Sequence, residues 1–392
     1  MLTLKQVKLL WFAIPFIALI ITTLQGPVHY NNYLIFKQVF WHTIQEKNLY
    51  LPYPLEYFDT NHYGPFFALI IAPFALLPNA LGIILWGMTN ITILYFAINY
   101  LPISNESKKV VLLISLIETL TAIQNEQINP IIAASIILAY VLIKKDKQFL
   151  ASALIIAGTM IKIYSIVGLV FIIFSERRLN FILYCCFWCL LFLALPMSIS
   201  SFDFIIHSYQ NWYHSILGKN TTNIRSYLSD GMQDISFIGI ARRVTGYYEL
   251  KSIYFLLPAA VLSLLPLIRF KHLANHSFQL TYLAQLLIGV VIFSSSAESS
   301  TYVIAVTGFA IWYIIQHPHP TSTINLLLLF VLILTVLSPT DFFPRFLREQ
   351  YVIKYALKAL PCVISWIAIT YSLLLSQHKN QPDYYQNLSY NT

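Results

Sequence analysis

The sequence has few charged residues. Only 10% of its 392 residues are Asp, Glu, Lys or Arg, whereas a soluble protein carries about 25%. The hydrophobic fraction is 58% and the mean hydropathy is +0.67. These values exclude an ordinary soluble domain and predict a polytopic membrane protein. The net charge of +8 does not predict a nucleic-acid partner, because the basic residues lie in short loops where they set the topology and meet membrane lipids.

Cysteines and nucleotide motifs are also scarce. The four cysteines give no disulfide framework, and Cys185, Cys186 and Cys189 stand in an apolar run without a nearby His or acid, so packing is favoured over metal binding. No P-loop, G-x-G-x-x-G or H-E-x-x-H occurs in a usable context. This disfavours a nucleotide-driven pump, a soluble-type nucleotide-sugar transferase and an intramembrane zinc protease. We expect no metal and no other cofactor.

Long apolar runs are what the sequence has instead. They lie near residues 9–25, 65–78, 81–100, 109–123, 130–144, 148–161, 163–175, 179–199, 252–269, 277–294, 301–316, 322–338 and 356–377. Backbone in lipid must satisfy its own hydrogen bonds, so these runs predict helices, and strand alternation typical of a barrel is not seen. The first run follows Lys5 and Lys8 without a cleavage site and is interpreted as a retained anchor. We expect one all-α membrane domain over residues 1–392, with about 12 transmembrane helices and one short or re-entrant segment.

Basic residues between the runs predict the orientation. The clusters that we assign to the cytoplasm are Lys5 and Lys8, Lys108 and Lys109, Lys144 to Lys147, Arg177 and Arg178, Arg269 and Lys271, and Lys379. Both termini are then cytoplasmic. The outer segments become 26–64, 124–130, 160–165, 200–251, 294–302 and 338–349. This assignment requires residues 65–100 to cross the membrane once in net terms, with a break at "APFALLPNALG".

The first outer segment carries candidate catalytic acids. Its residues 30–50 have apolar positions at helical spacing, which predicts an amphipathic helix on the outer membrane surface. "YPLEYFDTNHYGPFF" then places Glu56, Asp59 and His62 before an apolar run. Asp59 can simply cap a helix. Alternatively, a carboxylate at a partly desolvated rim can act as a general base toward an acceptor hydroxyl.

Two further outer turns carry polar groups suited to a sugar phosphate. Lys162 separates two half-length apolar runs, so it either snorkels or, if the chain breaks there, presents an ammonium to a lipid phosphate. "QNEQINP" offers Asn125 and Gln127, whose amides donate and accept hydrogen bonds as sugar hydroxyls require, although a plain polar turn is equally compatible. Glu118 stands inside an apolar run, where an acid is either functional or a structural hydrogen-bonding group.

The late outer turns add an acid and two cations. Glu298 lies among small hydroxyl residues in "SSSAESSTY", just before an apolar run. In "SPTDFFPRFLRE", Arg345 and Arg348 are three positions apart and can form a fork for a phosphate on one helical turn. The alternative is surface pairing with Asp341 or Glu349, which contributes little energy.

Several of these segments together resemble the family-87 glycosyltransferases of the GT-C superfamily. The resemblance rests on "LYLPYPLEYFDTNHYGPFFALIIAPFALLP", "NEQINPIIAASIILAYVL", "IIAGTMIKIYSIVGLVFIIF", "AESSTYVIAVTGFAIWYI" and "SPTDFFPRFLRE", and the last two are similar to a Bacteroidetes-like subgroup. It implies an enzyme of the bacterial inner membrane. Such an enzyme takes a sugar, typically mannose, from a polyprenyl-phosphate carrier and passes it to a lipid or glycan acceptor on the non-cytoplasmic side.

The sequence departs from that family early in the first outer segment. Where the family has its catalytic acid, this chain reads "HYNNYLIF", with Asn31 and Asn32. We therefore expect Asp59, Glu56 or Glu298 to act as the base in an inverting transfer. The residues that we expect to bind substrate are Lys162, Arg345, Arg348, Asn125, Gln127, His62 and Asn32.

Two alternative functions stay open. A transporter or flippase would be supported by inverted repeats with paired broken helices, and a scan of the sequence by eye finds no repeat. A non-catalytic relative would keep the fold after losing the early acid, which Asn31 and Asn32 allow. Release of a polyprenyl phosphate distinguishes an enzyme from both.

Overall fold

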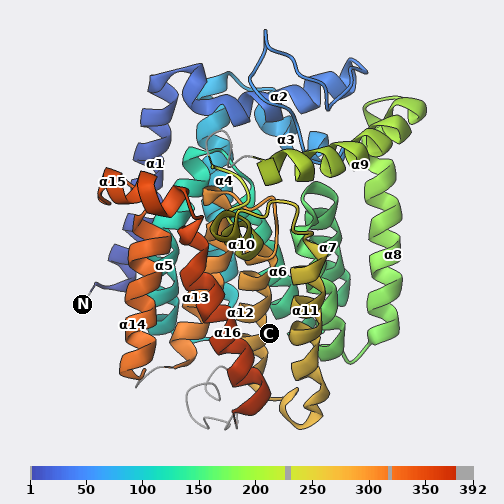
Figure 1. Ribbon diagram of the computed structural model, residues 1–392. Helices are drawn as coiled ribbons and strands as arrows, with labels where there is room; N and C mark the ends of the chain where they lie inside the picture. The colour runs from blue at the N-terminus through green and yellow to red at the C-terminus, as the bar shows by residue number, and fades with distance from the viewer. Residues whose placement is uncertain (1, 226–230, 317–319, 377–392) are drawn as a thin grey trace. The chain divides into compact units, whose positions relative to one another are not determined.

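The computed structural model describes residues 2–225, 231–316 and 320–376, in which all regular structure is helical and no strand occurs (Figure 1). The sequence prediction of an all-α polytopic membrane protein is confirmed. Lys379, one of the residues used to orient the chain, lies outside the described residues.

The helices follow the apolar runs. In chain order they are α1 (Leu4–Gln25), η1 (Pro27–Tyr30), α2 (Asn31–Ile44), α3 (Phe67–Ala75), α4 (Asn79–Tyr100), α5 (Asn105–Gln124), α6 (Asn129–Lys144), α7 (Gln148–Ile161), η2 (Ile163–Phe174), α8 (Arg178–Ala194), η3 (Leu195–Ser198), α9 (Phe202–Arg225), α10 (Phe237–Thr245), α11 (Ile253–Leu264), η5 (Leu265–Ile268), η6 (Phe270–His272), α12 (His276–Ile292), η7 (Ser299–Thr301), α13 (Tyr302–Ile315), α14 (Ser322–Phe330), η8 (Val331–Leu337), α15 (Arg345–Leu347), η9 (Arg348–Ile353), η10 (Leu357–Ala359) and α16 (Leu360–Leu375).

Several of these helices can cross a membrane by their length and composition. The longest apolar ones are Leu4–Gln25, Asn79–Tyr100, Arg178–Ser198 and Leu357–Leu375. Others, such as Asn129–Lys144 and His276–Ile292, are apolar but shorter.

The two predicted breaks are present. α3 ends at Ala75 and α4 begins at Asn79, so the proline-containing segment interrupts the helix as Pro78 requires. Lys162 has extended backbone dihedrals, φ −144° and ψ 117°, between α7 and the 3₁₀ helix η2. Lys162 thus lies in a non-helical link between two helices and not in the middle of one continuous helix.

The chain folds into two compact units. The Lys162 unit comprises Lys8–Ala97 and Ala122–Lys219, and the Lys358 unit comprises Met1–Val7, Ile98–Thr121 and Asn220–Thr392. That both form the single domain expected from the sequence stays a prediction.

The Lys162 unit is built around α6. Nearly every residue of this helix is buried, including Ile132, Ile136 and Tyr140, as expected of a helix that is apolar all round. The hydroxyl groups of Ser135 and Ser165 lie 2.8 Å apart where α6 meets η2. A shared hydroxyl pair keeps these buried oxygens satisfied.

The predicted helix of the first outer segment exists as α2, but its apolar residues face protein. Ile35, Val39 and Phe40 are buried, and the Phe36 ring stacks on Tyr63 with centroids 5.0 Å apart. The hydroxyl of Tyr33 donates to the Phe74 carbonyl over 2.8 Å. We expected this apolar side to lie on lipid. It instead closes the core of the unit, because the loop after α2 folds back over it.

The Lys358 unit has its core in the helical hairpin α12–α13 with α16 beside it. Gln285 donates to Thr370 over 2.8 Å, joining α12 to α16, and Thr307 donates to Ser115 over 3.2 Å, joining α13 to α5. These buried bonds fix helices whose apolar surfaces alone would not specify a register.

Candidate functional site

The loop that follows α2 is held by Glu56. The Glu56 carboxylate lies 2.7 Å from His42 Nε2, and the His42 ring lies 4.2 Å from that of Tyr53. Burial lowers the pKa of His42, although the hydrogen bond and charge of Glu56 oppose this shift. Glu56, one of the predicted bases, is thus engaged in fastening the loop to α2.

Asn31 and Asn32, where the resemblance led us to expect an acid, fasten the same region. The Asn31 amide donates to the Phe58 carbonyl and accepts from the Phe58 N–H, both over 2.7 Å. Asn32 donates to the Asn125 carbonyl over 3.0 Å. An acid could accept but not donate at position 31, so an amide suits this two-way contact with backbone.

Asp59 lies at the exposed part of this loop. Its backbone is left-handed, with φ 70°, a conformation that costs energy in a residue other than glycine and is tolerated best by Asp and Asn. In the part of the chain that is described, its carboxylate accepts one hydrogen bond, from the Thr60 N–H over 2.8 Å. The side chain is exposed and therefore accessible to an acceptor substrate.

His62 lies between this loop and α9. Its Nδ1 is 3.2 Å from the Ser215 hydroxyl, and Trp212 donates to its carbonyl over 3.0 Å. Burial, with smaller contributions from the charges of Lys219 and Lys162, lowers the pKa of His62 to about 4, and the charge of Asp59 opposes this shift. At neutral pH the imidazole is therefore neutral.

Lys162 extends from the α7–η2 break toward the same loop. Its ammonium donates to Asn129 over 2.8 Å and lies 5.1 Å from the Tyr164 ring centroid and 5.9 Å from that of Tyr63. Rings and an amide stabilise a cation without cancelling its charge. Gly64 allows this approach, because a Cβ there would collide with the Met160 carbonyl and the Trp212 ring.

The turn after α5 completes the cluster. Gln127 accepts from the Tyr63 hydroxyl over 2.7 Å. Glu126 is buried with a left-handed backbone, φ 47°, and Trp86 donates to its carbonyl over 2.7 Å. Burial raises the pKa of Glu126 to about 9, so the carboxyl is protonated at neutral pH. From the sequence we assigned a role to the amides of this turn and none to Glu126, whose burial was not predicted.

The Lys162 unit therefore gathers most of the predicted site. One polar cluster, which we call the His62 cluster, contains Asn32, Asp59, His62, Asn125, Gln127 and Lys162.

Glu298 belongs to the Lys358 unit, where it begins a short helix. It is the N-cap of η7 in a reciprocal capping arrangement, and its N–H donates to the Thr301 hydroxyl over 3.2 Å. The next residue, Ser299, accepts from Lys358 over 2.8 Å, and Lys358 also donates to Glu118 over 2.8 Å. The intramembrane acid predicted from the sequence is thus half of a buried ion pair. Its partner Lys358 was missed.

Arg345 and Arg348 line an open depression with Asp341 and Glu349 in the same unit. Arg345 Nε is 2.6 Å from Glu349, and Arg348 Nη1 is 3.7 Å from Asp341 and 3.0 Å from the Thr340 carbonyl. Each guanidinium therefore has its own acid. The surface pairing considered from the sequence is therefore present, and the phosphate fork stays a prediction.

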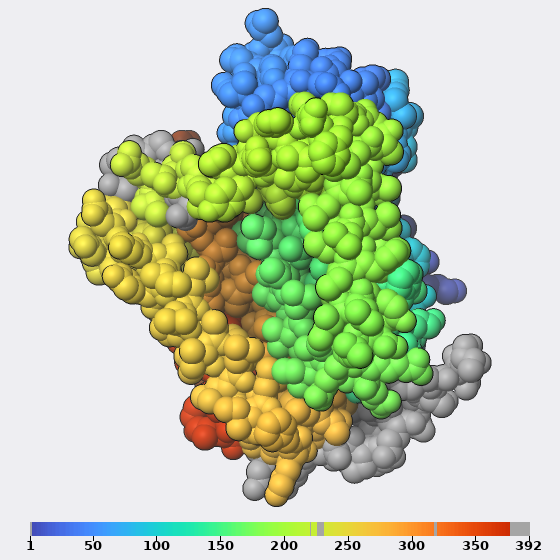
Figure 2. All heavy atoms as spheres, turned by 90° about the vertical axis from the view of Figure 1, so that its right-hand side faces the viewer, coloured from blue at the N-terminus to red at the C-terminus, as the bar shows by residue number. Residues whose placement is uncertain are grey.

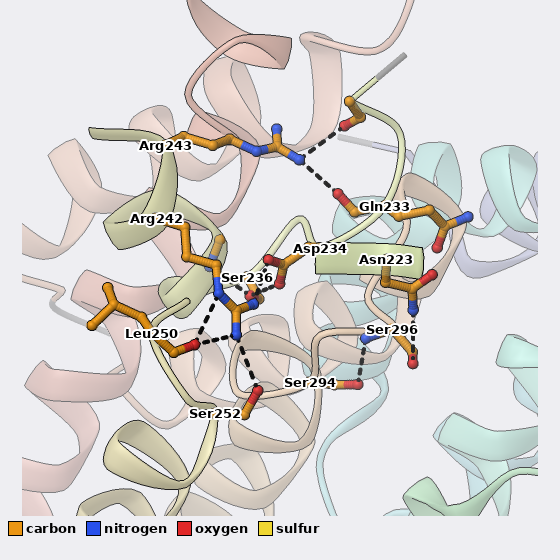
Figure 3. Close-up of polar contacts among 12 residues, drawn as sticks. Asn223, Gln233, Asp234, Ser236, Arg242, Arg243, Leu250, Ser252, Ser294 and Ser296 are labelled. Atoms are coloured by element: carbon orange, nitrogen blue, oxygen red, sulfur yellow. Dashed lines mark hydrogen bonds and ion pairs between the residues drawn. The ribbon is translucent and has the colours of Figure 1, made fainter. Parts of the chain in front are cut away.

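A second buried network in this unit was not predicted (Figure 3). Arg242 binds Asp234 over 2.7 Å and the Leu250 carbonyl over 2.6 Å. Arg243 donates over 2.6 Å to the carbonyls of Gln233 and Ile353. The arginines hold the segment before α10, whose Ile235 N–H donates to the Ala297 carbonyl over 2.9 Å beside Glu298. The sequence signal that could have predicted this network is the adjacent pair Arg242 and Arg243 in segment 200–251.

Within the described ranges, no group of three or more His, Cys, Asp or Glu residues is placed to hold a metal ion. The His62 cluster offers an exposed carboxylate, a neutral imidazole, an ammonium group and amides.

The sequence model of glycosyltransferase family 87 matches residues 61–339, which is more than half of the chain. His62, Asn125, Gln127, Lys162 and Glu298 lie within the match, whereas Asp59 precedes it and Arg345 follows it. No curated protein matches the chain. Because the match covers more than half of the chain, the chain belongs to glycosyltransferase family 87.

Proposed function

We propose that this glycosyltransferase moves a hexose such as mannose from a polyprenyl-phosphate carrier to a lipid or glycan acceptor. We place the reaction on the non-cytoplasmic side of a bacterial inner membrane, with both termini cytoplasmic. The observation that carries the proposal is the position of Lys162: its ammonium lies 5.9 Å from the ring of Tyr63, the residue next to His62, and the Tyr63 hydroxyl donates to Gln127. The family membership supports sugar transfer as the reaction class. The Bacteroidetes-like subgroup stays a prediction.

The donor phosphate is assigned to Lys162. Its ammonium lies at the break between α7 and η2, where it donates to the Asn129 amide over 2.8 Å and lies 5.1 Å from the Tyr164 ring centroid. Lys219 adds a second positive charge next to His62. Arg345 and Arg348, also predicted to bind phosphate, each lie beside a carboxylate. We therefore rank them below Lys162.

Asp59 is assigned as the general base. Glu56 is bound to His42 and Glu298 caps a helix, so a catalytic role for either would disturb a structural contact. Asp59 is exposed, and the one hydrogen bond of its carboxylate is to the adjacent backbone. Glu126 does not fit the role, since its raised pKa keeps it protonated at neutral pH.

The chemical step is a single displacement. The acceptor hydroxyl oxygen attacks the anomeric carbon while the bond from that carbon to the phosphate oxygen breaks. The acceptor proton passes to the Asp59 carboxylate, and the bonding electron pair leaves with the polyprenyl phosphate. Lys162 stabilises this leaving anion, so a general acid contributes little. The configuration at the anomeric carbon inverts.

Sugar recognition is assigned to the amides beside these groups. Asn125, Gln127 and Asn32 belong to the same cluster as Tyr63 and His62. Amides pair with sugar hydroxyls in both directions, and an aromatic ring can cover the apolar face of a hexose.

The test is a transfer assay with purified full-length protein. Radiolabelled polyprenyl-phosphate mannose and a bacterial membrane-lipid extract are supplied to wild type, to Asp59→Asn and to the control Asp203→Asn. Asp203 is also an exposed acid of the Lys162 unit. We expect label in a new product with wild type and the control, and a loss of about 10²-fold or more with Asp59→Asn. Unchanged transfer by Asp59→Asn removes the base assignment. Carrier movement across vesicles without release of polyprenyl phosphate indicates a flippase, and tight carrier binding without either process indicates a non-catalytic relative.

A further inference from the structure

Helix α9 has an exposed apolar stripe. Phe202, Ile206, Tyr213 and Leu217 are exposed, Phe202 by 64% and Tyr213 by 62%. With 3.6 residues per turn, positions 202, 206, 213 and 217 fall within an arc of about 60° on the helix surface. The stripe runs along most of the helix and no described residue of the chain buries it.

A polar stripe runs beside it. Asp203, His207, Gln210 and His214 are exposed, and their positions follow the apolar arc within the next third of the helix circumference. The remaining side packs on protein, where Ile205 and Ser208 are buried. The apolar stripe is therefore neither core nor part of a uniformly polar surface.

The position of α9 in the chain indicates what covers the stripe. It begins four residues after Arg178–Ser198, a candidate membrane span whose Leu183 and Leu190 are exposed by 57% and 70%. Glu46 fixes the short connection by accepting from the Ser201 N–H over 2.9 Å. Figure 2 shows α8 standing upright and α9 crossing its end on one face of the molecule. The lipid-facing surface of α8 thus continues onto the start of α9.

The composition of α9 makes it a surface helix and not another span. Its 24 residues include Asp203, His207, His214, Lys219 and Arg225, and it is not among the helices apolar enough to cross a membrane. A helix with a narrow apolar side and a polar side lies in the plane of the bilayer interface.

We propose that residues 202–217 of α9 bind the phospholipid leaflet, with the stripe of Phe202, Ile206, Tyr213 and Leu217 inserted at the boundary between head groups and acyl chains. The His207–His214 side then faces the head groups and water. The segment 200–251, which the sequence predicts to be an outer segment, thereby contributes a membrane-bound helix.

The lipid contact of α9 also bears on the His62 cluster. This step rests on the proposed function. The packed side of α9 carries Trp212 and Ser215, which hold the His62 carbonyl and imidazole. One helix therefore contacts lipid on one side and the site on another. That arrangement keeps the site at head-group depth, where a carrier phosphate lies.

The test is lipid photocrosslinking, which requires no activity. Full-length protein carrying p-benzoylphenylalanine at Tyr213 or Leu217, or at the polar positions His207 or His214, is reconstituted in phosphatidylethanolamine–phosphatidylglycerol vesicles and irradiated. Position Leu190 on α8 serves as the lipid-facing reference. Elution as a single species on size exclusion shows that each variant is folded. Intact-protein mass spectrometry then measures phospholipid adducts.

We expect adduct yields at 213 and 217 close to that at 190 and several-fold above those at 207 and 214. Equal yields on the two stripes overturn the proposal. A crosslink between two protein chains at 213 or 217 also overturns it, because the stripe would then be an interface between copies. Failure of the transfer assay with normal crosslinking would remove the proposed function and leave this contact in place.

Discussion

Half-buried Lys162 and the buried cations of the Lys358 unit are held by different groups. In the Lys162 unit, Lys162 is held by an amide and two tyrosine rings. In the Lys358 unit, Lys358 is held by Glu118 and Arg242 by Asp234, each at 2.7–2.8 Å. A carboxylate cancels the charge that it holds, whereas a dipole or a ring leaves that charge available to a ligand. We infer that the ion pairs of Lys358 and Arg242 stabilise the fold, whereas Lys162 is the residue that we propose to bind the donor phosphate.

We expect the largest loss of stability when the Glu118–Lys358 pair is broken. Both side chains are buried, with 0% and 4% of their surface exposed, so Lys358→Met leaves a carboxylate without its partner. We expect a loss of about 3–5 kcal/mol in the free energy of unfolding. The measurement is an unfolding titration in detergent.

The double variant Glu118→Leu/Lys358→Met is the matched control. Replacing a buried pair by apolar groups is close to neutral, so most of the lost stability should return. If the double variant is as unstable as Lys358→Met, the pair is not the reason for the loss.

A carboxylate placed beside Lys162 tests whether the charge of this lysine binds the donor. Asn129→Asp places a carboxylate at the amide that accepts from Lys162. We expect stability to stay the same or rise, while the KM for the polyprenyl-phosphate donor rises about tenfold, equivalent to about 1.4 kcal/mol. Gln210→Glu adds the same charge at an exposed position of the same unit and should leave KM unchanged. Equal KM values for Asn129→Asp and wild type would contradict the assignment.

The pH dependence of the free energy of unfolding tests whether the pKa of His62 is lowered in the folded state. Its pKa is lowered from 6.5 to about 4 in the folded state, so the unfolded chain binds more protons between these values. Stability is full above pH 6.5 and falls as the pH drops toward 4. His62→Gln should flatten this part of the curve, whereas His214→Gln, at an exposed histidine of α9, should not. An unchanged slope in His62→Gln would mean that His62 titrates normally.

The smallest effect is expected at Arg345. Its side chain is 81% exposed, as part of an i,i+4 pair with Glu349, and such surface pairs are screened by water and salt. Arg345→Gln should leave the unfolding midpoint in detergent within error of wild type. A clear loss of stability would show that this segment contributes more to the unit than its exposure indicates.

Much of the helical architecture was predictable because it depends on local pattern. The apolar runs predicted the long apolar helices, and the position of Lys162 between two half-length runs predicted the break at that residue. They did not predict α9, whose 24 residues lie in the outer segment 200–251. Charge in an apolar run is costly, so the break follows from sequence alone.

The pairings that form the site were less predictable. Lys358 lies 240 positions from Glu118, and α2 buries its apolar side because the loop at Phe58 folds back onto Asn31. No local pattern encodes either contact. The burial of Glu126 was not predicted for the same reason, because it depends on α2 and Trp86, which are distant in the chain.

The most direct test of the phosphate assignment is the donor KM of Lys162→Gln, measured for polyprenyl-phosphate mannose in reconstituted vesicles beside Lys47→Gln. Lys47 is an exposed lysine of the same unit. The proposal predicts a KM at least about tenfold higher for Lys162→Gln, with Lys47→Gln equal to wild type. An unchanged KM in Lys162→Gln would contradict it and move the donor phosphate elsewhere, with Arg345 and Arg348 as the next residues to change.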